Sequence, residues 1–391
     1  MLSISSRALG SPKSLNIVND VILWGPTPEG SWVLGDPRSP RSVEALMETA
    51  GRPAPCPIPD EYLASMEGIA RGQIPWPLII PSGIIGEHIR MISMQVDDAI
   101  DKLGNYAEVL TEGRRILCKL QQSKIDISAL RSCQEASTIG SIDSFEPGSN
   151  LTCDPPIYSH ATATGRLIVK EGPKILTIQK EHRRVLSSRF PGGKMMQIDF
   201  VSLEPRVLRL LRACEAPVDL YTDILSRVGG DVSRRQVKVA VLRSLYGSSK
   251  AGIREEVGAI GPKLIREVED YFGLKALQEK LHQQLRTKGH IKSHWGRPLR
   301  EATDNHLLVS HFTQSTAVDV SLLGFGQLTD RIIAEDLDVI PCFVLHDALL
   351  LDTAPQHMER LRQIAAAGID IDGLGHFEVS FTPAYLEAEE S

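Results

Sequence analysis

Two isolated aspartates, each at the end of an apolar run, constrain the fold of this chain more than any other feature. Asp199 follows the run 195–198, and Asp347 stands between the apolar runs 342–345 and 348–351. A carboxylate buried without a partner is costly, so each of them must pair with something. We therefore predict a strand over 195–200 and a β-hairpin over 339–352 that turns at His346-Asp347, and we interpret the two carboxylates as a site for a pair of divalent cations.

A basic helix is predicted between the two aspartates. Ser233 and Gln236 match a capping box that opens it, and a cationic or bulky residue recurs four positions apart. Since each step of four turns about 40° around the axis, these side chains share one shallow stripe. The stripe consists of Arg234, Lys238, Leu242 and Tyr246. Its basic end suits phosphates and its apolar end suits a base and sugar, whereas the alternative is a surface helix with scattered basic residues.

The charge distribution indicates a phosphate-binding surface despite a net charge of −6. Residues 166–300 hold 27 Lys and Arg against 14 Asp and Glu, and the remainder holds 16 against 35. A basic block inside an acidic chain is typical of a groove for a nucleic-acid backbone, although solvated helix faces are the alternative interpretation.

Composition favours a cytoplasmic globular protein. No apolar run approaches the length of a membrane span, the N-terminus lacks the apolar core of a secretory signal, and the six cysteines are scattered. We therefore expect no membrane partner, no disulfide framework and no zinc site.

The remaining pattern predicts further elements. Residues 21–24 and 31–34 suggest a hairpin around the turn-prone 26–30, and helices are expected over 85–103 and from 105 to about 121. Pro205 is expected at the first position of a helix that runs through Arg212. We also expect helices over 256–288 and a last strand over 377–381.

These segments together resemble the family A DNA polymerases, of the bacterial DNA polymerase I type. Asp199–Arg206 is similar to motif A, Arg234-x3-Lys238-x7-Tyr246-Gly247 to motif B, and His346-Asp347 to motif C. Four more matches follow in the family's order, at 162–167, 183–190, 289–297 and 314–319. The resemblance covers residues 157–352 continuously.

The resemblance implies a chemical role for each matching residue around the nucleotide. Two Mg²⁺ ions would be held by Asp199, Asp347 and the Phe200 carbonyl, and Lys238 would be the general acid for the leaving pyrophosphate. The nucleotide would be bound by Arg234, Lys238, Leu242, Tyr246 and Glu204, of which Glu204 would exclude a 2′-hydroxyl.

It also implies a set of DNA contacts. Arg166 and Gln314 would touch the minor groove at the primer terminus, and His346 would contact the terminal primer phosphate. Gly247 would let a template base approach the backbone, and Arg206 would brace the DNA-binding site. The implied partners are primer–template DNA, dNTPs and other replication proteins.

The implied fold is α+β, a right hand with an antiparallel-sheet palm. We expect a region of unassigned role at 1–80, a thumb at 81–156, a palm at 157–205 and 286–391, and helical fingers at 206–285. Residues 1–80 are too few for a proofreading exonuclease, so we expect synthesis without proofreading.

Departures from the family pattern keep two alternatives open. The usual Phe and Gly of motif B are Leu242 and Arg243, and the carboxylate after His-Asp is Ala348. An RNA or primer polymerase on the same fold remains one alternative. A catalytically silent nucleic-acid-binding subunit is the other.

Overall fold

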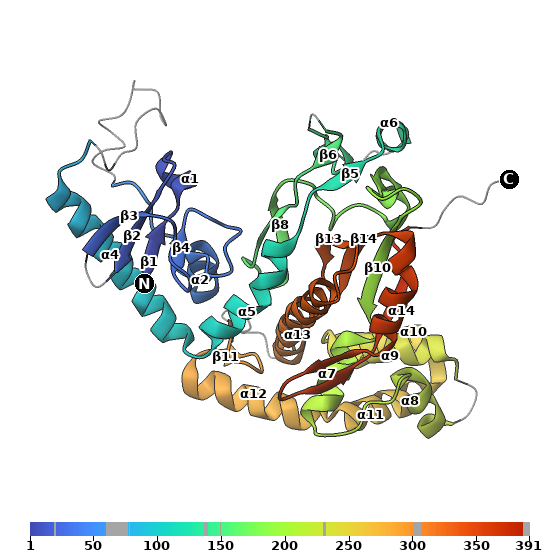
Figure 1. Cartoon of the computed structure of the whole chain (residues 1–391). Helices are drawn as coiled ribbons and strands as arrows, with labels where there is room; N and C mark the ends of the chain where they lie inside the picture. The colour runs from blue at the N-terminus through green and yellow to red at the C-terminus, as the bar shows by residue number, and fades with distance from the viewer. Residues whose placement is uncertain are drawn as a thin grey trace.

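The structure is a computed structural model that describes residues 1–18, 21–59, 77, 79–136, 140–148, 150–229, 232–299 and 306–385. An N-terminal sheet, two long helices, a central antiparallel sheet and a block of helices follow one another through the molecule (Figure 1). No helix within the described residues is long and apolar enough to cross a membrane.

The central sheet carries both predicted aspartate segments. Its order is β13-β14-β10-β17, and every neighbouring pair is antiparallel. The strands are β10 (Lys194–Phe200), β13 (Val339–Leu345), β14 (Ala348–Thr353) and β17 (Val379–Pro383). Asp199 lies opposite Ala348 in register, and the Phe200 amide donates to the Asp347 carbonyl at 3.0 Å. The predicted strand and hairpin are confirmed, and the sheet brings the end of one beside the turn of the other.

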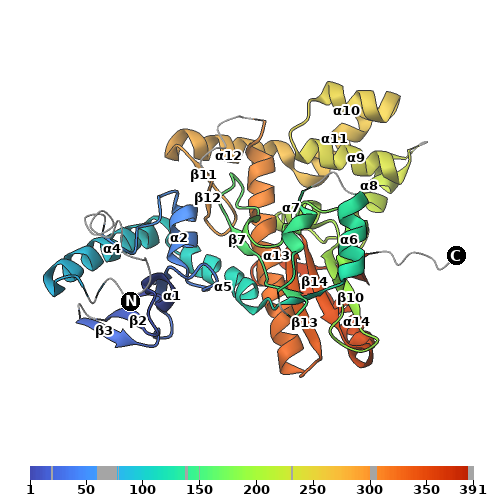
Figure 2. The same ribbon diagram turned by 90° about the horizontal axis from the view of Figure 1, so that it is seen from above.

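Two helices cover this sheet and fix its position. α13 (Leu308–Ala334) packs on β10 through Phe325, whose ring centroid lies 5.3 Å from that of Phe200. α5 (Tyr106–Lys119) crosses α13 where Gly113 comes close to Leu322, so close that a Cβ at Gly113 would lie 3.3 Å from the Leu322 Cβ. A larger residue at 113 would push the two helices apart. Both helices pass beside the sheet in two views (Figures 1 and 2).

A block of six helices with its own apolar core follows β10. They are α7 (Leu203–Leu211), α8 (Leu220–Val228), α9 (Arg234–Leu245), α10 (Lys250–Val257), α11 (Gly261–Phe272) and α12 (Leu274–Lys288). The predicted capping box at Ser233 and Gln236 is present. α7 begins two residues before Pro205, because Ser202 takes a left-handed conformation with φ 53° and turns the chain directly from strand to helix. The predicted helical stretch 256–288 is interrupted at Gly258 and Gly273, both at positive φ.

The N-terminal sheet differs from the predicted hairpin. Its strands are β1 (Leu2–Ile4), β2 (Ser14–Val18), β3 (Val21–Gly25) and β4 (Trp32–Leu34), in the order β3-β2-β1-β4. The predicted pairing of 21–24 with 31–34 is wrong: β3 pairs with β2, and β4 lies parallel to β1. Only two residues separate β2 from β3, which favours pairing between them.

α2 (Val43–Ala50) and α4 (Ser82–Leu103) share an apolar core with this sheet. The last predicted strand is displaced, since β16 (Gly375–Phe377) and β17 take the place of 377–381. Smaller elements complete the described chain: α1 (Ser6–Leu9), β5 (Ser123–Ile125), α6 (Ile127–Ala136), β6 (Thr152–Cys153), β7 (Ile157–Ser159), β8 (Ile168–Glu171), β9 (Leu186–Ser187), β11 (Ile291–Lys292), β12 (Pro298–Leu299), α14 (Met358–Ala366) and β15 (Ile369–Ile371).

Candidate active site

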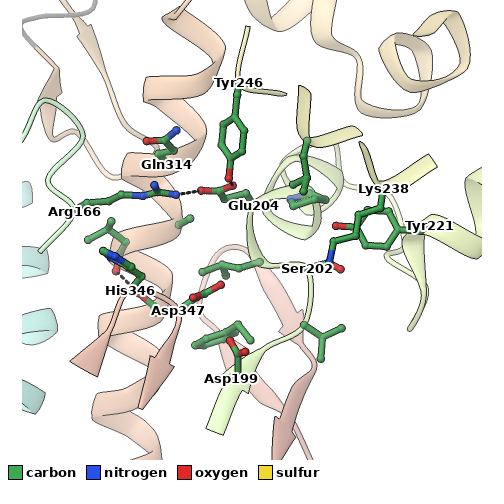
Figure 3. Close-up of a pocket in the computed structure, with 18 of the residues that line it drawn as sticks. Arg166, Asp199, Ser202, Glu204, Tyr221, Lys238, Tyr246, Gln314, His346 and Asp347 are labelled. Carbon is green, nitrogen blue, oxygen red and sulfur yellow. Dashed lines mark hydrogen bonds and ion pairs between the residues drawn. The ribbon is translucent and has the colours of Figure 1, made fainter. Parts of the chain in front are cut away.

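One cavity of about 490 Å³ gathers nearly all the predicted site residues. Its walls come from the end of β10, the β13–β14 turn, α7, α8, α9 and α13 (Figure 3). The predicted residues that line it are Arg166, Asp199, Phe200, Glu204, Arg234, Lys238, Leu242, Tyr246, Gln314, His346 and Asp347. Segments far apart in the sequence therefore meet at a single site, and the predicted stripe of α9 faces it along its whole length.

Each of the two aspartates has a pKa above its ordinary value. Burial, and then the charge of Asp347, raise the pKa of Asp199 to about 7. Burial also raises the pKa of Asp347. Asp199 Oδ1 is buried and has no hydrogen-bond partner among the described residues. Bringing two carboxylates together in a poorly solvated place disfavours their charged forms, and a bound cation reverses that effect.

These donors fit a divalent cation that also binds substrate phosphates. Mg²⁺ prefers oxygen ligands and is commonly bound through one or two protein carboxylates, with phosphates and water completing its shell. Within the described ranges no cluster of three or more His, Cys, Asp or Glu side chains could hold a metal ion by itself. The carboxylates proposed for this site are those of Asp199 and Asp347, and Ala348 stands where the motif that His346-Asp347 resembles has a third.

The two cationic side chains that α9 presents to the cavity, Arg234 and Lys238, differ in whether they are paired. The Arg234 guanidinium donates to both oxygens of Asp219, at 2.7 and 3.2 Å, and lies 5.3 Å from the Tyr221 ring centroid. This contact with Arg234 is the main cause that lowers the pKa of Asp219 to about 2. Lys238 has no hydrogen-bond or ion-pair partner among the residues described, so its ammonium is available to a ligand.

Glu204 connects the two sides of the cavity. Its Oε1 accepts from Arg166 at 2.5 Å, and its Oε2 accepts from the Tyr246 hydroxyl at 2.5 Å (Figure 3). Burial, and then the contact with Glu204, raise the pKa of Tyr246 to about 12, so that this hydroxyl remains a donor. The side chain predicted to sense the sugar therefore also holds two other predicted site residues.

The hairpin turn and α13 supply the remaining polar groups. His346 takes a left-handed conformation, with φ 50°, at the turn beside Asp347, and burial lowers the pKa of its imidazole. Gln314 lines the cavity from α13 and donates from Nε2 to Ser310 at 2.9 Å.

Arg206 and Gly247 lie outside the cavity. Arg206 is 1% exposed and donates to the backbone carbonyls of Ala216, Pro217 and Val218. These contacts brace the loop between α7 and α8, and the contribution of Arg206 to the DNA-binding site stays a prediction. Gly247 has φ 75°, and a Cβ there would lie 2.3 Å from the His306 carbonyl oxygen. The glycine is required by this close backbone approach, whatever else binds nearby.

Sequence reasoning missed Asp219, Tyr221 and Ser202, which also belong to the site. Tyr221 and Ser202 line the cavity, and Asp219 pairs with a predicted phosphate ligand. The only signal for Asp219 was its position before an apolar helical pattern, which is typical of a helix N-cap. Its side chain does accept from the Tyr221 and Thr222 amides.

Comparisons with known proteins identify relatives of the chain. No family model matches it. It is 26% identical over 234 residues to DNA polymerase I of Geobacillus stearothermophilus, over 51% of this chain and 27% of that protein. It is 25% identical over 303 residues to DNA polymerase I of Bacillus caldotenax, over 68% of this chain and 33% of that protein. The chain thus spans about a third or less of the length of these relatives.

A solved structure gives the fold. The polymerase domain of Pol1 from M. smegmatis, in complex with DNA primer-template and dNTP, matches with a TM-score of 0.50 and 17% sequence identity. The match covers 87% of this chain and 63% of that one. The predicted α+β right-hand polymerase fold is confirmed.

Proposed function

We propose that the chain is a DNA polymerase of family A, a template-directed enzyme that adds dNTPs to the 3′ end of a primer. The observation that carries this proposal is the single cavity on which Asp199, Asp347 and the cationic stripe of α9 converge. Two carboxylates for cations, beside two basic side chains for a triphosphate, are the groups that nucleotidyl transfer requires. The proposed partners are primer–template DNA, dNTPs and other replication proteins.

The residues divide the reaction between them. Asp199, Asp347 and the Phe200 carbonyl would hold two Mg²⁺ ions, which supply Lewis acidity toward the primer 3′-hydroxyl and the departing pyrophosphate when bound. Arg234 releases Asp219 and binds the triphosphate, and Lys238 donates a proton to the leaving pyrophosphate oxygen. Movement of α9 toward the palm would bring both side chains onto the phosphates and exclude water.

Three further side chains align the substrates. Arg166 and Gln314 line the cavity on the same side of Glu204 (Figure 3) and are suited to the minor-groove acceptors of the terminal base pair, which are alike in all sequences. His346, at the hairpin turn, would contact the terminal primer phosphate. Leu242 and Tyr246 supply the apolar floor for the incoming base and sugar.

The proposed parts of the hand follow the elements. The palm comprises 157–205 and 286–391 and contains the central sheet, the fingers comprise 206–285 with α9, and the thumb comprises 81–156 with α4 and α5. Residues 1–80 have no assigned role.

Primer extension tests the proposal. Wild-type protein should extend a labelled primer with dNTPs when Mg²⁺ is present, and Asp199→Asn or Asp347→Asn should abolish extension while primer–template binding by filter retention stays nearly unchanged. A near-normal rate in either variant would show that the cations are held elsewhere. Duplex binding without any extension by the wild type would instead establish the silent DNA-binding subunit that Ala348 allows. Extension with NTPs in preference to dNTPs would establish an RNA polymerase.

A further inference from the structure

Asp199 has a polar contact with a residue that does not line the cavity. Gln197 lies two residues earlier on β10, so its side chain projects from the same face of the strand. Its Nε2 donates to Asp199 Oδ2 at 3.3 Å, and the Gln197 side chain is buried. Gln197 does not line the cavity and matches none of the family motifs in the sequence.

The orientation of this amide is fixed by a third residue. Arg183, from the short 3₁₀ helix Lys180–Val185, donates from Nη1 to Gln197 Oε1 at 2.8 Å. A guanidinium can only donate, so the amide oxygen of Gln197 must face Arg183 and its NH₂ group must face Asp199. The three side chains form one directed sequence of hydrogen bonds, from Arg183 through Gln197 to Asp199.

This sequence of hydrogen bonds leaves the two oxygens of Asp199 in different states. Oδ2 is engaged by a neutral donor, whereas Oδ1 is buried and has no partner among the described residues. A direct ion pair with Arg183 would offset the negative charge that a cation needs. The intervening amide orients the carboxylate and keeps the guanidinium one residue away. Such orientation matters more here because Ala348 stands opposite Asp199 in place of a third acid.

We propose that Arg183 and Gln197 are positioning residues that hold the Asp199 carboxylate with Oδ1 available to a divalent cation. This inference rests on the proposed function, because it concerns the cation site of the same cavity. Outer groups that orient a metal ligand typically change metal affinity by about 10- to 100-fold when they are removed. The expected effect is therefore on cation affinity, more than on the binding of DNA or nucleotide.

Mn²⁺ binding measures this effect without turnover. The full chain is bound to primer–template whose primer lacks a 3′-hydroxyl, so that no extension occurs, and dNTP is added. The concentration of free Mn²⁺ is then measured by electron paramagnetic resonance. Gln197→Met and Arg183→Met should each raise the Mn²⁺ dissociation constant about tenfold. Arg184→Met is the matched control, since Arg184 is the adjacent residue and donates to Ser132 and Cys133 away from Asp199. The control should bind Mn²⁺ as the wild type does.

A double variant distinguishes positioning from general damage. If Arg183 acts only through Gln197, the double variant should bind Mn²⁺ no more weakly than the weaker single variant, because contacts in one network are not additive. Additive losses in the double variant, or wild-type affinity in either folded single variant, would overturn the proposal. Thermal melts verify folding, and Gln197→Ala replaces Gln197→Met if the latter does not fold.

The wild type separates the two levels of inference. If it binds Mn²⁺ in the complex and extends primers while both variants match it, only the positioning role fails. If it neither binds Mn²⁺ nor extends primers under any nucleotide set, the polymerase assignment fails, and the positioning role fails with it.

Discussion

At the scale of single residues, burying Asp199 beside Asp347 destabilises the cation-free fold when the carboxylate is charged. Asp199 has a pKa of about 7 in the fold, above its ordinary value of 3.8, because it is buried beside Asp347. The fold thus favours the protonated carboxyl. The stabilisation that it gives is complete at acid pH below the ordinary pKa, and it is lost as pH rises through about 7. Such strain is typical of sites whose ligand relieves it.

Asp199→Asn should therefore stabilise the cation-free protein while abolishing primer extension. In EDTA at pH 8 we expect the melting temperature to rise by about 2 °C, since the amide carries no charge to bury. The difference from wild type should grow as pH rises toward about 7 and then stay constant. Differential scanning calorimetry across pH 5–9 measures it. A variant less stable than wild type at pH 8 would contradict the burial argument.

Glu204 combines two tasks that are separable by mutation. Its carboxylate is in contact with Arg166 and Tyr246, and the resemblance makes it the group that excludes a 2′-hydroxyl. Glu204→Ala should raise the ratio of kcat/KM for NTP over dNTP by about tenfold or more, since one steric and electrostatic barrier is removed. Single-nucleotide insertion kinetics measure this ratio. Tyr246→Phe is the matched control, because it breaks the hydrogen bond to Glu204 and leaves the carboxylate in place. An equal loss of sugar selection in both variants would mean that the Tyr246–Glu204 hydrogen bond, and not the carboxylate alone, discriminates between the sugars.

At the scale of elements, the ion pair between α8 and α9 would oppose the proposed binding of a triphosphate. Arg234 would have to leave Asp219, an exposed partner that also caps α8. Exposed pairs of this kind are worth about 0.2–1 kcal/mol, so Asp219→Asn, which keeps a capping side chain, should lower the KM for dNTP about two- to fivefold. Steady-state kinetics test this, with Asp223→Asn on the same helix as control. A higher KM would mean that Asp219 preorganises Arg234 instead of competing with the nucleotide.

The elements that sequence patterns predicted well are those with a local cause. The capping box at Ser233 depends on only four consecutive residues, and the turn at His346-Asp347 lies between two apolar runs, so both were identified. The N-terminal sheet was mispredicted because strand partners depend on tertiary choice, and β4 pairs with β1 across thirty residues of chain. α7 begins before Pro205 because Ser202 adopts a left-handed conformation, which a serine does not predict.

For the site as a whole, motif spacing predicted which residues converge, and it could not predict what each one touches. Asp199, Lys238 and Asp347 were named because their types and positions suit the chemistry. Arg206 was expected to brace the DNA-binding site, but the sequence did not show that its guanidinium donates to carbonyls of the loop after α7. Gln197 was given no role, because a polar residue in a strand carries no signal until the strand's neighbours are known.

At the scale of the whole molecule, a buried cluster ties the helical arm, formed by α4 and α5, to the rest of the chain. Arg297 donates to the Tyr106 hydroxyl at 2.7 Å, and Tyr106 donates to Asp319 at 2.6 Å. Arg297 also contacts Asp319 at 3.2 Å. The three residues come from α5, the segment before β12, and α13, and none is more than 4% exposed. The cluster therefore fixes where the arm stands relative to the helix behind the active-site cavity.

Breaking this cluster should cost far more stability than breaking a surface pair. Asp319→Ala leaves Arg297 charged and buried without its carboxylate, which should lower the free energy of unfolding by about 3–5 kcal/mol. Tyr106→Phe removes one hydroxyl from a network that otherwise keeps its ion pair, and about 1–2 kcal/mol is expected. Arg41→Met, which breaks the more exposed pair between Arg41 and Glu108 of α5, should cost less than about 1 kcal/mol. Urea unfolding of the three variants gives the order of their free energies of unfolding directly. If Asp319→Ala were no more harmful than Arg41→Met, the position of the arm would depend on apolar packing between α5 and α13, and Gly113 would become the residue to test.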